Sequence, residues 1–245
     1  MFSLQTNLHA DRTMKAMNVL KFRVIKPSDL GKIQKFYIDN FYAHEPVFSS
    51  TPKLIPSRRD QNDIAECVKQ GTSILCYRET HRGNEEIIGG LLAMPKKSSY
   101  VEELFRASEE EGNTKYGHYL RMLATLHKEA DICKRYNVDQ LFFTLMGTVD
   151  PKWRGNNICK RLLDESVALA TDMGYKVYTT DCTSNYSDRI CEKYLKMHKL
   201  VSLKYKDFVD ENGKPHFNVP EPHQEVNTYA MTLPWPIKAF QEYRK

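Results

Sequence analysis

The residues between positions 147 and 161 have types and spacing that could bind a phosphorylated ligand. They begin at the end of a short apolar run, residues 141–147, which predicts a buried strand. The chain then turns and enters a helix whose apolar positions recur at three- and four-residue spacing until Gly174, where a left-handed C-cap is expected. A helix start that combines free backbone amides with two nearby cations is suited to a pyrophosphate.

The pattern across this turn, Arg154-Gly155-Asn156-Asn157-Ile158-Cys159, resembles the acetyl-CoA signature of the GCN5-related N-acetyltransferases. In that family a strand is followed by Arg-x-x-Gly-x-Gly/Ala at the head of a helix. Asn157 and Cys159 take the places of two small residues; asparagine tolerates the left-handed backbone region and cysteine is small. The resemblance implies acetyl-CoA as co-substrate and no metal, with the cofactor held by Gly147, Thr148, Val149, Arg154, Gly155, Asn156, Asn157, Ile158, Cys159 and Lys160.

Two further segments extend the resemblance to the insect arylalkylamine N-acetyltransferases. A strand expected at residues 176–181 runs into the Ser/Thr-rich stretch 182–187, and a Glu45-Pro46 pair closes a first helix. From Lys21 onward the resemblance implies direct transfer of an acetyl group to a small primary amine, best an arylalkylamine such as dopamine, serotonin, tyramine or octopamine. Two alternatives stay open: another amine (a polyamine, histamine or a protein N-terminus), or a degenerate CoA-binding module without catalysis.

Acetyl transfer requires a base, because alkylamines have a pKa of roughly 10 and arrive protonated at neutral pH. Glu45 is the candidate base. At a helix C-terminus the dipole disfavours its charge, so its pKa should be raised if the side chain is also buried. The alternative is a solvated residue at the end of a helix.

Hydroxyl groups are expected to relay protons at the leaving thiol. Thr183 and Ser187 match the two serines that the insect enzymes place there, although Thr183 could instead only cap the next helix. The tyrosine that many members of the superfamily use falls at Cys191, unless Tyr186 or Tyr194 substitutes for it. A backbone amide around Gly147 to Val149 could polarise the thioester carbonyl, while a glycine in a β-bulge is the alternative reading of Gly147.

Composition limits the remaining possibilities. Residues 1–20 are expected to be a mobile extension without a signal peptide, and residues 21–245 a single N-acetyltransferase domain. The net charge of +5 is spread among acidic residues rather than gathered in a basic stripe, which disfavours nucleic acid. No apolar run is long enough for a membrane span, and the six cysteines lack metal-ligand spacing. We therefore expect a cytoplasmic protein, monomeric or weakly dimeric.

The expected architecture is α/β, with a central mixed, mostly antiparallel twisted sheet and helices on both faces. Two hairpins bracket the α/β centre, and the family resemblance adds a splayed parallel strand pair. Helices are expected at residues 28–42, 57–70 and 116–136, and a loop or short helix at residues 95–113. Further strands are expected at residues 20–25, 73–79, 86–94, 200–208 and 226–233.

Overall fold

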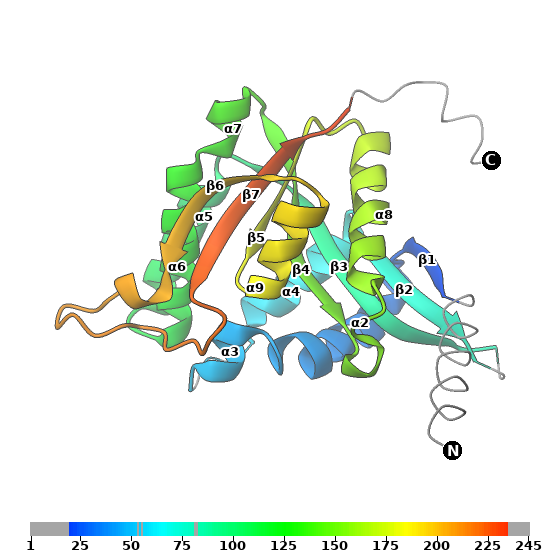
Figure 1. Ribbon diagram of the computed structural model, residues 1–245, viewed down its shortest axis with the longest axis horizontal. Coiled ribbons are helices and arrows are strands. Elements are labelled where there is room, and N and C mark those ends of the chain that lie inside the picture. The colour runs from blue at the N-terminus through cyan, green and yellow to red at the C-terminus, as the bar shows by residue number, and fades with distance from the viewer. Residues whose placement is uncertain (1–19, 53, 55, 81–82, 235–245) are drawn as a thin grey trace, which may run out of the picture.

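A single seven-stranded sheet organises the computed structural model, which describes residues 20–52, 54, 56–80 and 83–234 (Figure 1). The strand order is β1-β2-β3-β4-β5-β7-β6, and β4 and β5 form the parallel pair among neighbours that are otherwise antiparallel. The strands are β1 (Lys21–Val24), β2 (Ile74–Glu79), β3 (Glu85–Lys97), β4 (Gln140–Val149), β5 (Val177–Cys182), β6 (His198–Lys204) and β7 (Glu225–Thr232). The predicted mixed sheet is confirmed.

Helices cover both faces of this sheet, as predicted (Figure 1). One face carries α8 (Ile158–Asp172), α9 (Asn185–Arg189) and a π-helical turn, η4 (Ile190–Tyr194). The other carries α2 (Leu30–Tyr37), a π-helical turn η2 (Ile38–Tyr42), α3 (Pro46–Ser50), α4 (Arg58–Lys69), α5 (Tyr100–Glu111), α6 (Lys115–Ala130) and α7 (Ile132–Tyr136).

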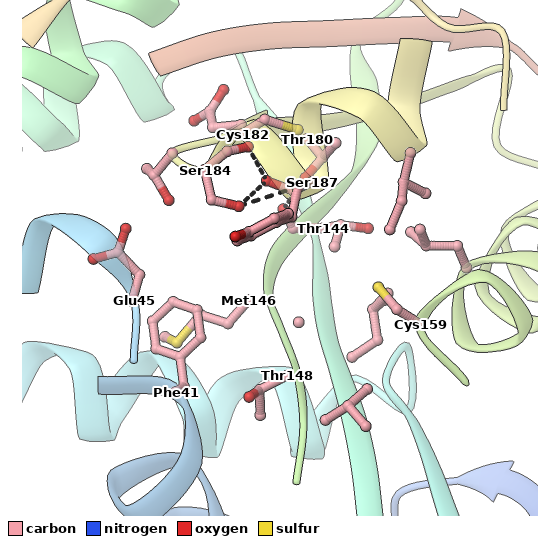
Figure 2. A pocket seen from close by; sticks show the side chains of 18 of the residues that line it. Phe41, Glu45, Thr144, Met146, Thr148, Cys159, Thr180, Cys182, Ser184 and Ser187 are labelled. Carbon is pink, nitrogen blue, oxygen red and sulfur yellow. Dashed lines mark hydrogen bonds between the residues drawn. The ribbon is translucent and has the colours of Figure 1, made fainter. Parts of the chain in front are cut away.

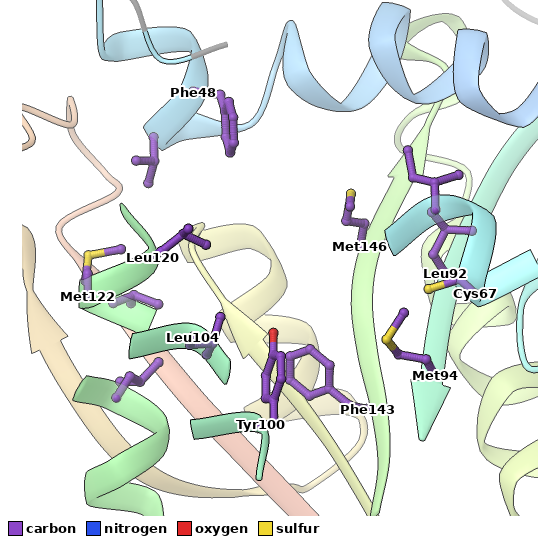
Figure 3. Close-up of a cluster of buried hydrophobic side chains, with 14 of the residues drawn as sticks. Phe48, Cys67, Leu92, Met94, Tyr100, Leu104, Leu120, Met122, Phe143 and Met146 are labelled. Atoms are coloured by element: carbon purple, nitrogen blue, oxygen red, sulfur yellow. The ribbon is translucent and has the colours of Figure 1, made fainter. Parts of the chain in front are cut away.

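Each face of the sheet has its own hydrophobic core, because successive strand residues point to opposite sides. On β4, Phe142 packs with Leu162 and Tyr178 in the core beneath α8. Its neighbour Phe143 belongs to the larger core beneath α2 to α7, together with Leu120 (Figure 3). The two cores hold helices against both sides of the sheet, and they thereby fix the positions of the strands between the helices.

The predicted splay between the parallel strands is present. β4 and β5 pair over only three positions, the last being Thr144 with Thr180, whose hydroxyl donates to the Thr144 carbonyl at 3.1 Å. Beyond that point β4 stays paired with β3 as far as Val149, and β5 stays paired with β7 as far as Cys182. The sheet therefore divides into two halves that share only a short seam.

A β-bulge lies on β4 directly after the seam. In the register with β3, Thr144 faces Ala93 and Met146 faces Leu92, so Leu145 is the extra residue. A bulge bends its strand, and this one lies where β4 turns away from β5.

Some predicted elements were wrong in their extent. The helix expected at residues 116–136 is broken at Asp131, whose φ of 39° is left-handed and ends α6 before α7 begins. Residues 95–113, expected as a loop or short helix, contain the twelve-residue helix α5. Ser28 does not cap the first helix, because it lies inside the 3-10 turn Pro27–Asp29 that precedes α2. In that turn the Asp29 carboxylate accepts the Lys26 amide at 2.8 Å.

The extension expected at residues 1–20 falls almost entirely outside the described residues, and so does the end of the predicted domain from residue 235 onward. Within the part of the chain that the structure describes, no helix has the length and apolar character that crossing a membrane requires.

A buried hydroxyl relay braces the seam from the α8 side. Thr144 Oγ1 donates to the Tyr178 hydroxyl at 2.6 Å, and that hydroxyl donates to Ser166 Oγ on α8 at 3.1 Å. All three side chains are buried. Removal of the central hydroxyl leaves two buried polar groups without this partner, which typically costs about 1–3 kcal/mol.

We therefore expect Tyr178→Phe to lower the free energy of unfolding by about 1–3 kcal/mol in chemical denaturation. Tyr186→Phe is the matched control, because that side chain is 64% exposed and its loss of a hydroxyl should have little effect. Equal stability of the two variants would show that the relay does not stabilise the seam.

Candidate active site

A cavity of about 730 Å³ passes between the two halves of the sheet (Figure 2). Its walls come from both faces. Arg154, Ile158 and Lys160 line it from the side of α8, and Glu45 and Tyr119 line it from the side of α3 and α6. A ligand in this cavity would therefore reach through the sheet at the splay.

The loop before α8 has the backbone geometry of an anion site. Gly155 and Asn157 both have left-handed φ values, 82° and 58°, and Asn157 immediately precedes the helix. Arg154 Nε donates to the Val149 carbonyl at 3.1 Å, which ties the loop to the end of β4. The amides in the first turn of a helix have no acceptor within the helix. In α8 these first-turn residues are Ile158, Cys159 and Lys160, and all three line the cavity. The donors present suit a pyrophosphate.

Nine of the ten residues predicted to hold acetyl-CoA line the cavity. Asn156 is the exception, because its side-chain amide donates back to the Trp153 carbonyl at 3.0 Å and fastens the turn. At Gly147 an added Cβ would meet only Leu91 Cδ1, 3.9 Å away, so the position faces open space. The bulge residue is Leu145, and Gly147 is thus a wall of the cavity rather than a bulge glycine.

Glu45 lies buried in the wall of the cavity, with 6% of its surface exposed. Its Oε2 accepts the Phe48 amide at 2.7 Å, and Oε1 has no hydrogen-bond partner among the described residues. Burial raises the pKa of the carboxyl, while the nearby Thr183 side chain and the amides of Phe48 and Val47 oppose this only in part. A buried carboxylate oxygen without a hydrogen-bond partner has acceptor capacity left for a proton.

Of the two causes predicted for a raised Glu45 pKa, burial is present and the helix C-terminus is not the dominant helix end. Pro46 begins a new helix, α3, so Glu45 is an N-cap rather than a residue acted on only by a preceding helix C-terminus. At an N-cap the helix amides favour the negative charge. Burial alone therefore accounts for the upward shift of the Glu45 pKa.

Three hydroxyl side chains of the β5–α9 turn line the same cavity (Figure 2). Ser184 caps α9 by accepting the Ser187 amide at 3.1 Å, so Thr183, which also lines the cavity, is not the cap. Ser187 Oγ donates to the Ser184 carbonyl at 2.9 Å and lies 2.9 Å from Ser184 Oγ. The prediction named Thr183 and Ser187 and missed Ser184, although a serine directly before the helix is itself a capping signal.

Cys191 stands in the wall where the superfamily's tyrosine is expected, and its Sγ lies 3.5 Å from Cys182 Sγ. Of the two tyrosines named as substitutes, Tyr186 lines the cavity, whereas Tyr194 donates to Asp164 at 2.7 Å and does not line it. Burial raises the pKa of the Cys159 thiol to about 11, so this thiol is protonated at neutral pH and is a weak nucleophile.

Aromatic side chains line the cavity on the side of α6. Four aromatic residues follow one another along α2, η2 and α3. Phe41 lines the cavity, while Tyr37, Tyr42 and Phe48 pack in the core. Sequence reasoning missed three further aromatic wall residues, which come from α5, α6 and β4: Tyr100, Tyr119 and Phe143. Tyr119 and Phe143 fell within an expected helix and an expected strand, and Tyr100 fell within the segment expected as a loop or short helix. Among the described residues, no group of three or more His, Cys, Asp or Glu side chains could hold a metal ion.

Comparison with known proteins identifies the class. No protein-family model matches the chain. Among solved structures, an apo agmatine N-acetyltransferase is 25% identical with a TM-score of 0.80, over 88% of this chain and 100% of that one. A mosquito arylalkylamine N-acetyltransferase-like protein is 26% identical with a TM-score of 0.78, over 87% and 100%. The fold of Arabidopsis thaliana NAA60, solved with acetyl-CoA, is shared at 16% identity, with a TM-score of 0.52 over 87% and 98%.

These likenesses confirm the predicted fold, that of the GCN5-related N-acetyltransferases. The chain is accordingly an acyltransferase, and its relatives in structure include the insect arylalkylamine N-acetyltransferases. The two neighbours at 25–26% identity are named as N-acetyltransferases of amines, and Arabidopsis thaliana NAA60 was solved with acetyl-CoA.

The loop before α8 predicts how acetyl-CoA should affect stability. A ligand at about a hundred times its dissociation constant adds about 2.7 kcal/mol to the free energy of unfolding. Arg154→Glu places a negative charge beside the expected pyrophosphate and should abolish most of that gain, measured as the thermal shift caused by acetyl-CoA. Arg121→Glu makes the same charge change on the exposed side of α6 and should leave the shift unchanged. A full shift in Arg154→Glu would place the cofactor elsewhere.

The cysteines in the wall give a second prediction. Neither Cys159 nor Cys191 should be a nucleophile, because direct attack needs no acyl-enzyme. Cys159→Ala and Cys191→Ser should each retain activity within about a few-fold of wild type, measured as thiol release from acetyl-CoA. Mass spectrometry of the enzyme during turnover should find no acetylated cysteine, and finding one would contradict direct attack.

Proposed function

We propose that this protein transfers the acetyl group of acetyl-CoA to the primary amine of an arylalkylamine by direct attack. One observation carries the proposal: a single cavity crosses the sheet, with an anion-binding helix start on one face and a buried carboxylate among aromatic walls on the other. The two co-substrates would meet at the splay, where β4 and β5 no longer pair.

The cofactor half of the proposal rests on the start of α8. Free amides from Asn157 onward, with Arg154 and Lys160 beside them, would hold the pyrophosphate. The pantetheine arm would lie in the splay. A backbone amide in the segment Gly147 to Val149 would then donate to the thioester oxygen as negative charge develops on it.

The amine half rests on Glu45. A neutral amine is the nucleophile, so the ammonium must lose a proton before or during attack. Glu45 lines the cavity, its Oε1 has no hydrogen-bond partner among the described residues, and its raised pKa brings its basicity closer to that of the amine. Proton acceptance by this oxygen, directly or through water, is the role we assign to Glu45.

The leaving thiol requires a proton donor on the other side of the carbonyl. Ser187 and Thr183 line the cavity at the start of α9, and both carry hydroxyls that can pass a proton onward. Tyr186 lines the same region and is the second candidate for this step.

The aromatic walls favour an arylalkylamine, because aromatic rings gain from edge-to-face contacts with other rings beyond simple burial. Phe41, Tyr100, Tyr119 and Phe143 supply such rings. A second candidate is agmatine or a polyamine, supported by the likeness to the agmatine enzyme.

We further propose that residues 21–245 act as one domain in the cytoplasm, where the six free cysteines would stay reduced.

The sharpest test is Glu45→Gln in a thiol-release assay with acetyl-CoA and dopamine. The amide keeps the shape of the side chain but accepts no ammonium proton, so turnover should fall at least about a hundredfold. Acetyl-CoA affinity should stay near the wild-type value, because Glu45 lies on the amine side. Glu129→Gln, an exposed position on α6, is the matched control and should leave turnover unchanged.

The pH dependence follows from the direction of the Glu45 shift. A carboxyl with a raised pKa stays protonated, and inactive as a base, to higher pH than a free glutamate. The wild-type rate should therefore rise with pH through an apparent pKa above about 4.3. Glu45→Gln should recover in part at high pH, since more amine then arrives neutral. If Glu45→Gln turns over at the wild-type rate at neutral pH, the base is a different residue.

A further inference from the structure

We propose that the Asp181 carboxylate, held by His127 and Thr228 at the aromatic end of the cavity, accepts a hydrogen bond from the ring hydroxyl of a phenolic arylalkylamine. The inference rests on the proposed function and deepens it, because it names the feature of the amine that the site selects. Asp181 would thus determine specificity, while Glu45 acts on the amine itself.

Asp181 comes from β5 and points toward α6. Its neighbour Thr180 bonds across the seam to β4, and strand alternation turns Asp181 to the opposite face, where it lines the cavity. There its Oδ2 lies 2.7 Å from His127 Nε2 on α6, and its Oδ1 accepts the Thr228 hydroxyl at 2.7 Å. Three elements therefore fix this carboxylate in one position.

The carboxylate has acceptor capacity that these two partners do not use. Two carboxylate oxygens offer about four lone-pair sites, and one partner is bound to each oxygen. Asp181 and His127 expose only 9% and 7% of their side chains, so bulk water satisfies little of the remainder. A donor brought by a ligand would meet a carboxylate that is already oriented and largely desolvated, conditions under which such a bond is strong.

The surroundings of this carboxylate suit an aromatic ring. Tyr100 and Phe143 both line the cavity, and both pack against the ring of His127, with centroids 5.1 and 5.3 Å away. The imidazole that holds Asp181 is thus wedged behind two wall residues. A substrate ring resting on those walls would carry its hydroxyl toward Asp181.

A neutral hydroxyl fits this end of the cavity better than a second cation. The ammonium of Lys96 already lies 3.7 Å from the centroid of the Tyr100 ring, where it takes up the cation–π capacity of that wall. A second cation would also have to shed its water to enter an apolar pocket, whereas a phenol loses far less. The negative charge of Asp63 acts on Lys96, and Asp63 does not line the cavity.

The first test compares two amines that differ by one hydroxyl, tyramine and phenethylamine, with the wild-type enzyme and acetyl-CoA. We expect kcat/KM to favour tyramine by about tenfold or more, the factor that a hydrogen bond to a charged group typically supplies. Equal values for the two amines would overturn the proposal without any variant. Absence of thiol release with both amines would instead remove the proposed function, and the inference with it.

The second test is Asp181→Asn. It should lower kcat/KM for tyramine about tenfold or more while phenethylamine stays within about twofold, and retained phenethylamine activity also proves that the variant folds. Asp188→Asn is the matched control: that carboxylate accepts the Tyr229 hydroxyl at 2.6 Å but does not line the cavity, so the ratio between amines should not change. His127→Gln, which can still donate to Asp181, should keep more of the tyramine preference than His127→Leu.

Two results would overturn the assignment even if Asp181→Asn loses activity. An equal loss with tyramine and phenethylamine would mean that Asp181 only supports the fold. A loss confined to agmatine, with tyramine unaffected, would mean that the carboxylate binds a distal cation instead of a hydroxyl.

Discussion

The early end of pairing between β4 and β5 is the constraint on which the rest of the structure depends. Beyond Thr144 and Thr180, each strand keeps its outer neighbour but has lost its inner one. The facing backbone amides and carbonyls then need other partners, since buried peptide groups are rarely left unpaired. The splay is stable only beside something polar, and under the proposed function the amide-bearing arm of acetyl-CoA would supply those bonds.

Local signals made part of the site predictable from sequence. The loop before α8 is contiguous, and the requirement for a left-handed residue before the helix is visible in Asn157 itself. The parallel pairing of β4 with β5 likewise follows from the order of elements along the chain, because a strand, a helix and a second strand in succession commonly place the two strands side by side. In such a contiguous feature, the residues expected to bind the ligand and the strand and helix that position them lie in one stretch of the sequence.

Features that depend on contacts between distant segments could not be predicted in the same way. Glu45 was found by resemblance, but its environment was misjudged because Pro46 begins a short helix whose apolar pattern is too brief to recognise. Tyr100 lies in a polar, acidic helix that composition alone described as a loop or short helix. The pairing of Asp181 with His127 joins residues 54 positions apart, and nothing in the spacing of either residue signals the other.

The passage of the cavity through the sheet has a stereochemical consequence. Attack on a thioester carbonyl forms one bond and breaks another at the same carbon, so a proton must be removed at the nucleophile and supplied at the leaving sulfur. Here Glu45 stands on the α3 side of the sheet, and the α9 hydroxyls stand on the α8 side. The cavity nevertheless joins the two positions through the splay, and the Thr183 side chain lies near the Glu45 carboxyl. Under the proposed function, base and acid are therefore different residues from opposite faces of the sheet that share one cavity, so a proton accepted by one does not have to leave the cavity to reach the other.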